Sequence, residues 1–201
     1  MIGTNLTRAK KLLEDRQIVA IPTETVYGLA AHAFNMPAVN KLFEIKQRPK
    51  SKPLIIQTHS LAKVEELVAY MPPEAKKMAY AFWPGPLTLL LEKKSFIPDL
   101  ITSGTSKVGI RIPNQNTTLK LLESLSFPLV VTSANISGQP SCITAEEVQN
   151  QLGNQIPYIL DGGKCQLRLE STIIGFDANL PKLYRLGAIS QPTIEKVIGK
   201  T

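Results

Sequence analysis

The chain has 201 residues, of which 43% are hydrophobic and 19% are charged, and this is enough for one soluble domain with a full core. No apolar run is long enough to span a membrane, and the charged, amphipathic segment 1–16 does not resemble a signal peptide, so we expect a cytoplasmic protein. The net charge of +7 favours anionic partners, and Cys142 and Cys165 show no zinc-ligand spacing.

Apolar residues at helical spacing alternate with short apolar runs along the whole chain. Several neighbouring strands are joined by links too short for a helical crossover, so the sheet must contain antiparallel as well as parallel pairs. We therefore predict one α/β domain over residues 1–201, with a twisted mixed sheet flanked by helices rather than a simple Rossmann fold. In chain order the predicted elements are a helix at 5–16, a strand at 18–21, a helix from Pro37 towards Lys46, a strand at 54–57, a helix capped by Ser60, a helix from Pro73 to Trp83, strands at 87–91 and 108–112, a helix at 118–125, a strand at 129–132, a helix at 144–152, strands at 158–160, 172–176 and 183–185, and a helix from Pro192.

A cluster of cations follows the second predicted helix. Lys46, Arg48, Lys50 and Lys52 lie within seven residues and end where a buried strand begins. A charge run that meets a buried strand aims several cations at one point instead of forming a solvated tail. The ligand that suits such a point is a polyphosphate or a group of carboxylates.

Two polar segments each follow an apolar strand. Residues 22–28 and 133–138 are rich in hydroxyl, amide and glycine groups, and polar groups at strand ends commonly form ligand sites in α/β sheets. The alternative is that each segment is a turn or a helix cap whose side chains serve only the local backbone. The residues alone leave both interpretations open.

Arg111 is the one charged residue in an otherwise apolar strand, so we expect it to pair with a buried acid or to bind an anion. Lys107 and Arg185 are placed in a similar way on their strands. Thr144 opens a capping box, which is enough to explain it. The chain contains no Walker A, GxGxxG or GxSxG motif, and neither histidine lies near a nucleophile pattern, so a nucleotide site would have to use scattered cations and loop amides.

Six motifs occur in a specific order: Pro-Thr-Glu-Thr-Val-Tyr-Gly-Leu at 22–29, Lys-x-Arg-Pro with Lys-Pro-Leu at 46–54, Trp-Pro-Gly-Pro-Leu-Thr at 83–88, Val-Gly-Ile-Arg-Ile-Pro at 108–113, Thr-Ser-Ala-Asn-x-Ser-Gly at 132–138 and Glu-Ser-Thr at 170–172. Their combination resembles the YrdC/TsaC family of threonylcarbamoyl-AMP synthases over roughly residues 5–187, in the short form without an extra C-terminal domain. The resemblance implies a twisted mixed sheet around a concave, basic cleft. It also implies a reaction in which L-threonine, bicarbonate and ATP give L-threonylcarbamoyladenylate and pyrophosphate, for later use by threonylcarbamoyl-transferase proteins that modify tRNA.

The resemblance further implies roles for individual residues. Catalysis is expected from Lys46, Arg48 and Arg111. L-threonine is expected to contact Thr25, Gln57, Arg111, Ser133 and Ser171. ATP is expected to contact Arg48, Lys52, Lys107, Asn135, Thr144 and Arg185, with Mg²⁺ accompanying the triphosphate and no resident metal site. Three positions depart from the family pattern, since Gln57 replaces a common histidine, Arg168 a common glycine and Gly175 a common acid.

These residue types suit the chemistry, because a carbamate that attacks the α-phosphorus of ATP brings several negative charges together. Cations and amide donors can offset that repulsion without a covalent intermediate. Two alternatives stay open. The chain could be an RNA-binding or ribosome-assembly module, with weak tRNA or RNA binding through its positive charge, or a paralogue of the same fold that acts on another acceptor.

Overall fold

The computed structural model describes residues 1–199, and in this range ten strands form one sheet. The strands are β1 (Ile2–Gly3), β2 (Val19–Ile21), β3 (Gly28–His32), β4 (Ile55–Gln57), β5 (Leu87–Glu92), β6 (Lys107–Arg111), β7 (Leu129–Ser133), β8 (Tyr158–Leu160), β9 (Thr172–Asp177) and β10 (Leu180–Arg185).

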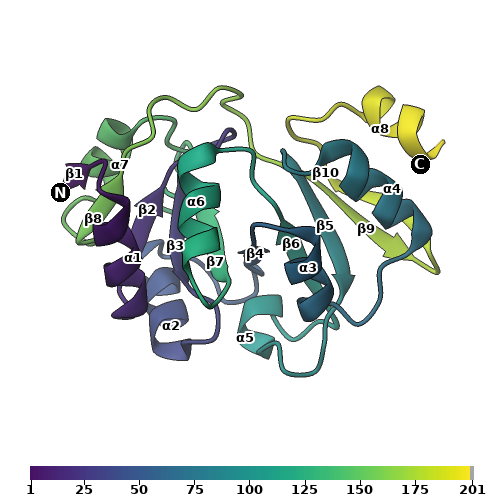
Figure 1. Cartoon of the computed structure of the whole chain (residues 1–201), viewed down its shortest axis with the longest axis horizontal. Coiled ribbons are helices and arrows are strands. Elements are labelled where there is room, and N and C mark those ends of the chain that lie inside the picture. The colour runs from purple at the N-terminus through teal and green to yellow at the C-terminus, as the bar shows by residue number, and fades with distance from the viewer. Residues whose placement is uncertain (200–201) are drawn as a thin grey trace.

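The helices lie around this sheet (Figure 1). They are α1 (Leu6–Glu14), α2 (Met36–Ile45), α3 (Leu61–Leu67), α4 (Pro73–Phe82), α5 (Asp99–Thr102), α6 (Asn116–Ser124), α7 (Ala145–Leu152) and α8 (Gln191–Ile198). Within residues 1–199, no helix has the length and apolar character that a membrane crossing requires.

The sheet is mixed, as the short links in the sequence predict. Its strand order is β1-β8-β2-β3-β7-β4-β6-β5-β9-β10. The pairs β1–β8, β2–β8, β4–β6 and β5–β9 are parallel, whereas β2–β3, β3–β7, β4–β7, β5–β6 and β9–β10 are antiparallel. The single α/β domain is therefore built on interleaved strands, and the neighbouring strands at its centre, β3, β7, β4 and β6, are far apart in the sequence.

Two apolar clusters form the core. In the smaller one, buried leucines of α1 and α6 pack on one face of β2, β3, β7 and β8. The larger cluster lies on the other face of these strands, against α2 and α7, and continues under α3 and α4. Successive residues of a strand point to opposite faces, and β2 accordingly gives Val19 and Ile21 to the smaller cluster and Ala20 to the larger.

The predicted elements are all present, with ends that differ by a few residues. The predicted helix caps at Ser60 and Thr144 are confirmed, since each hydroxyl accepts a hydrogen bond from a backbone N–H three residues later. Three elements were not predicted: β1, β3 and α5. The first half of β10 was not predicted either, since the strand begins at Leu180 rather than at Leu183.

Candidate active site

A cavity of about 550 Å³ lies over the central strands β7, β4, β6 and β5. Its floor is a row of residues that are Cα partners from strand to strand, namely Val131, Ile55, Gly109 and Leu90. Residues paired in this way point to one face of a sheet, so the floor of the cavity consists of apolar side chains and one glycine. Nine of the predicted site residues line the cavity: Thr25, Arg48, Lys52, Gln57, Lys107, Arg111, Ser133, Ser171 and Arg185.

Three arginines from separate parts of the chain approach one another around this cavity. Burial lowers the pKa of Arg48, and the positive charge of Arg185 lowers it further. Burial also lowers the pKa of Arg185, where Glu170 acts in the opposite direction and Arg111 adds to the lowering. Since each arginine senses the charge of the next, together they create a field that favours a ligand with several negative charges. The predicted convergence of cations holds for these three residues.

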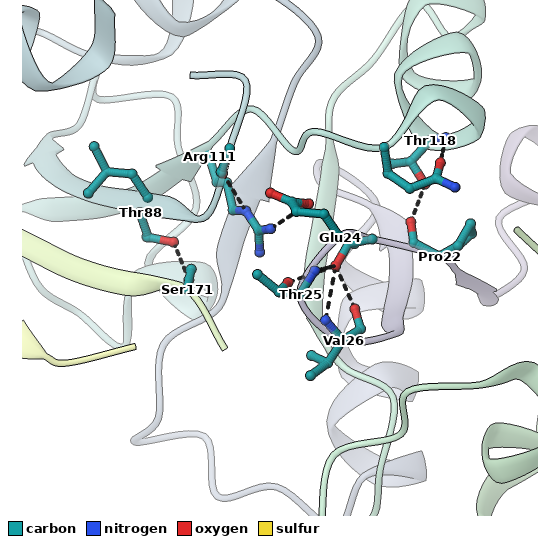
Figure 2. Close-up of polar contacts among 12 residues, drawn as sticks. Pro22, Glu24, Thr25, Val26, Thr88, Arg111, Thr118 and Ser171 are labelled. Atoms are coloured by element: carbon teal, nitrogen blue, oxygen red, sulfur yellow. Dashed lines mark hydrogen bonds and ion pairs between the residues drawn. The ribbon is translucent and has the colours of Figure 1, made fainter. Parts of the chain in front are cut away.

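Arg111 is held from behind the cavity wall (Figure 2). Its Nε donates a hydrogen bond to the carbonyl oxygen of Gly85 at 3.1 Å, and its Nη2 lies 2.8 Å from Oε2 of Glu24. Both side chains of this ion pair are buried. The sequence predicted a buried acid or an anion as the partner of Arg111, and the structure identifies the acid as Glu24. Gln57 is the cross-strand neighbour of Arg111 and belongs to the same wall.

Ser171 connects two sides of the cavity. Its hydroxyl lies 2.8 Å from that of Thr88, as Figure 2 shows. Arg185 donates to the carbonyl oxygen of Ser171 through Nη2 at 2.8 Å and through Nε at 3.1 Å. Two donors of Arg185 are therefore used by the protein, and the guanidinium is fixed beside the residue that is expected to contact L-threonine.

Glu170 is the one carboxylate among the residues that line the cavity within the described chain. Ser141 donates a hydrogen bond to its Oε1 at 2.6 Å. This hydrogen bond is the main cause that lowers the pKa of Glu170, with a smaller contribution from Arg185 and an opposing effect of burial. Glu170 is therefore ionised near neutral pH and offsets part of the positive charge of the cavity.

The segment 22–28 combines a turn with a cavity wall. The hydroxyl of Thr23 donates to the carbonyl oxygen of Val26 at 2.6 Å and accepts from the backbone N–H groups of Thr25 and Val26. Thr23 therefore serves the local backbone, which was one of the two interpretations of this segment. Thr25 contributes its own hydroxyl, 2.7 Å from that of Thr23, to a position on the cavity lining.

Lys46 has a different place from the other cations of its cluster. It ends α2 and is almost wholly buried, and it is not among the residues that line the cavity. Its Nζ donates to the carbonyl oxygens of Ser133 and Asn135, the latter at 2.6 Å, and to Oδ1 of Asn135 at 3.1 Å. Burial, with a smaller effect of Arg48, lowers the pKa of Lys46 to about 7. Lys46 therefore fixes the segment 133–135 by hydrogen bonds from a buried position outside the cavity lining.

The remaining predicted residues make contacts within the protein. Asn135 is buried, and its amide nitrogen donates to the carbonyl oxygens of Ile136 and Gln139. Thr144 caps α7 and does not line the cavity. Lys107 does line it, but its Nζ donates to the carbonyl oxygen of Phe176 and lies 3.0 Å from Asp177.

At two of the positions that depart from the family pattern, Arg168 and Gly175, the structure shows what the change of residue affects. Arg168 adopts a φ of 55°, a left-handed conformation in which a glycine has no steric penalty. At Gly175, a Cβ would lie 2.7 Å from the ring of Tyr184, which is part of the cavity wall. Gly175 therefore makes room for an aromatic side chain at the cavity that a longer residue would displace.

Glu24, Glu170, Thr88 and Gly85 contribute to the site, although the residues alone had given them no role. All four lie inside the motifs quoted above, and the two glutamates are the acids of motifs made otherwise of apolar and hydroxyl residues. That contrast was the signal that could have identified them. Among residues 1–199, no three His, Cys, Asp or Glu side chains gather in a way that could hold a metal ion.

Comparisons with known proteins agree with this architecture. A family model for Sua5, YciO and YrdC proteins, described as "Telomere recombination", matches residues 11–187. A threonylcarbamoyl-AMP synthase of Pyrococcus abyssi is 43% identical over 192 residues, which cover 96% of this chain and 56% of that protein. A second, from Bacillus subtilis, is 40% identical over 195 residues, again 96% of this chain and 56% of that protein.

A solved structure is also similar to this one. The crystal structure of P. abyssi Sua5 complexed with L-threonine superposes with a TM-score of 0.94 at 42% identity, over 97% of this chain and 57% of that chain. The chain thus spans little more than half the length of these relatives. The ordered motifs, the strand order and the matched family model lead to one conclusion: the chain belongs to the Sua5/YciO/YrdC family.

Proposed function

We propose that the protein is a threonylcarbamoyl-AMP synthase, which forms L-threonylcarbamoyladenylate and pyrophosphate from L-threonine, bicarbonate and ATP. The observation that carries this proposal is the convergence of Arg48, Arg111 and Arg185 on one cavity. The names of the relatives and the L-threonine in the P. abyssi structure support the same assignment.

Two of the arginines suit the triphosphate. The positive charge of Arg185 acts on Arg48, so a polyanion between the two side chains would offset their electrostatic repulsion. Lys52 and Lys107 line the same cavity and complete the proposed nucleotide contacts, whereas Asn135 and Thr144, from which contacts with ATP were also expected, are not among its lining residues. The apolar floor suits the flat, uncharged part of a nucleotide.

The third arginine suits the amino acid. Arg111 lies beside Gln57 and close to the wall that carries Thr25, and a guanidinium is the side chain best matched to a carboxylate. Ser133 and Ser171 supply further hydroxyl groups on the cavity lining for the polar atoms of L-threonine. The amino acid and the triphosphate then share one space, which is what a reaction between them needs.

In the adenylation step, an oxygen of the threonine carbamate attacks the α-phosphorus of ATP, and the bond to the bridging oxygen of pyrophosphate breaks. The reacting groups are all negative, so the arginines lower the barrier by offsetting charge and by holding the groups in line. Lys46 contributes indirectly, by fixing the carbonyl groups of Ser133 and Asn135. Mg²⁺ would enter with ATP as part of the substrate, because it prefers oxygen ligands such as those of the triphosphate.

The adenylate would pass to threonylcarbamoyl-transferase proteins that act on tRNA, and we expect this reaction to take place in the cytoplasm. Weak contact with tRNA would follow from the net charge of +7. We infer that residues 1–201 form one domain, because each half of the sheet joins strands that are far apart in the sequence. One half combines β1, β2 and β3 with β7 and β8, and the other combines β4, β5 and β6 with β9 and β10.

The test is to incubate purified protein with ATP, bicarbonate and labelled L-threonine and to measure threonine-dependent pyrophosphate and adenylate. Arg48→Ala and Arg111→Ala should each lower kcat/KM at least 100-fold, equivalent to about 3 kcal/mol of transition-state stabilisation. Lys50→Ala is the matched control, because Lys50 belongs to the same charge cluster but is exposed and outside the cavity lining. Wild-type turnover in both arginine variants would contradict the assignment. Salt-sensitive RNA binding that ignores ATP, with no adenylate formed, would favour the RNA-binding module.

A further inference from the structure

Arg111 is anchored by two residues, Gly85 and Glu24, that have no assigned part in the reaction. The carbonyl oxygen of Gly85 accepts from its Nε at 3.1 Å, and Glu24 lies against its Nη2 at 2.8 Å, as Figure 2 shows for Glu24. Gly85 belongs to the turn at 83–86 and Glu24 to the segment 22–28. Two loops that are far apart in the sequence therefore fix one guanidinium.

Each anchor is itself held in place. The backbone N–H of Gly85 donates to the carbonyl oxygen of Ile112 at 2.8 Å, and a Cβ at position 85 would lie 2.2 Å from the carbonyl oxygen of Phe82. The turn at 83–86 can therefore approach Arg111 only with a glycine at this position. The second anchor is held by a backbone hydrogen bond: the carbonyl oxygen of Glu24 accepts from the backbone N–H of Leu167 at 2.9 Å, which attaches the segment 22–28 to the segment that contains Leu167.

The anchors lie behind the cavity wall. Arg111 lines the cavity, whereas neither Glu24 nor Gly85 does. Within residues 1–199, no hydrogen bond or ion pair engages Nη1 of Arg111. The carboxylate oxygens of Glu24 are buried and, in the same part of the chain, form no hydrogen bond, so the ion pair with Arg111 is their main compensation. Nε is hydrogen-bonded and Nη2 is ion-paired, so Nη1 is the guanidinium nitrogen that has no partner among residues 1–199 and can be offered to a ligand.

We propose that Glu24 and Gly85 are positioning residues that act through Arg111 and direct its free nitrogen at the carboxylate of the amino-acid substrate. This inference rests on the proposed function. Within residues 1–199, no hydrogen bond or ion pair joins Glu24 to Arg48 or Arg185, so the proposed contacts of these two arginines with the triphosphate do not depend on this carboxylate. Loss of the Glu24 carboxylate should therefore weaken the binding of the amino acid much more than that of ATP.

The experiment measures KM and kcat for each substrate in Glu24→Gln, which keeps the size of the side chain and removes its charge. The KM for L-threonine should rise at least tenfold, while the KM for ATP stays within twofold of wild type. Thr118→Val is the matched control: the Thr118 hydroxyl donates to the carbonyl oxygen of Pro22 at the other end of the same loop, away from Arg111 (Figure 2). This variant should leave both KM values within twofold.

A second background tests whether Glu24 acts through Arg111. In Arg111→Lys all donors lie on one nitrogen, which cannot replace three separately placed guanidinium nitrogens at Gly85, Glu24 and the substrate. Adding Glu24→Gln in this background should therefore change the KM for L-threonine by less than twofold. An unchanged KM in Glu24→Gln would overturn the inference. A tenfold rise that persists in the Arg111→Lys background, or an equal rise in Thr118→Val, would also overturn it.

Circular dichroism decides first whether the variants are folded. Should Glu24→Gln not fold, Glu24→Asp takes its place, since it keeps the charge but withdraws the carboxylate by one methylene. Its KM for L-threonine should rise at least threefold, and an unchanged value would overturn the inference. Wild-type protein that forms no threonine-dependent pyrophosphate would overturn the proposed function as well, whereas active wild type with an unchanged Glu24 variant would overturn this inference alone.

Discussion

Replacing Thr172 by valine should destabilise the protein by about 3 kcal/mol, because the Thr172 hydroxyl makes three hydrogen bonds in the core. It donates to the carbonyl oxygen of Ile189 at 2.8 Å and accepts from the backbone N–H groups of Gly187 and Ile189, each at 3.0 Å. Thr172 is wholly buried. Valine has nearly the same volume, so the loss consists of these three bonds at about 1 kcal/mol each.

For a chain of 201 residues, this loss corresponds to a fall in Tm of about 6–12 °C. Thermal unfolding followed by circular dichroism measures it, and urea unfolding followed by the fluorescence of Trp83 gives an independent value. Thr88→Val is the control: Thr88 is also wholly buried, on the neighbouring strand, and in the described chain its hydroxyl makes one hydrogen bond, to Ser171. It should lose about 1 kcal/mol, or about 2–4 °C. If Thr172→Val lost no more than Thr88→Val, the reasoning from hydrogen-bond number would be wrong.

Three further predictions follow from single residues. The pKa of Lys46 is about 7 in the folded protein, against an ordinary value of 10.5, so between these pH values the unfolded state binds more protons and the free energy of unfolding rises with pH. Lys46→Met should flatten this rise, as urea unfolding from pH 7 to 9.5 would measure, and an unchanged dependence of the free energy of unfolding on pH would contradict the prediction. Burial raises the pKa of Cys142 and Cys165 from 9.0 to about 11, which lowers the fraction of thiolate at pH 8. The native protein should therefore react with iodoacetamide about 100-fold more slowly than the unfolded protein, as mass spectrometry would measure, and equal rates would argue against buried thiols. Arg168→Gly should raise the free energy of unfolding by about 0.5–1 kcal/mol, because Arg168 has a φ of 55°, and a loss of stability on this change would show that its side chain contributes more than its backbone costs.

Local signals in the sequence predicted most of the fold. Capping residues and helical spacing located the helices, and Ser60 and Thr144 are caps in the structure. The strand β3 was missed because its residues, Gly28 to His32, include neither a β-branched residue nor a polar alternation. It is a strand because β2 and β7 pair with it on both sides, and such pairing is not visible in a local pattern.

A site residue could be predicted from the sequence where a charged residue interrupts an otherwise apolar strand. Arg111 interrupts an apolar strand, and this alone predicted a buried partner. The identity of that partner could not be predicted, because Glu24 reaches Arg111 only after the segment 22–28 folds against β6. Lys46 shows the opposite limit. Its neighbours in the charge cluster suggested a cation at the cavity, yet the end of α2 turns it towards the carbonyl groups of Ser133 and Asn135.

The parallel pairing of β5 with β9 has a consequence for biosynthesis. Ser171 and Arg185 border β9 and β10, so the ribosome delivers two walls of the cavity only after most of the polypeptide has been made. A nascent chain that has emerged as far as β8 already contains Arg48 and Arg111 but lacks Ser171 and Arg185. A ligand that contacts all four of these residues therefore stabilises the fold only after the last strands dock.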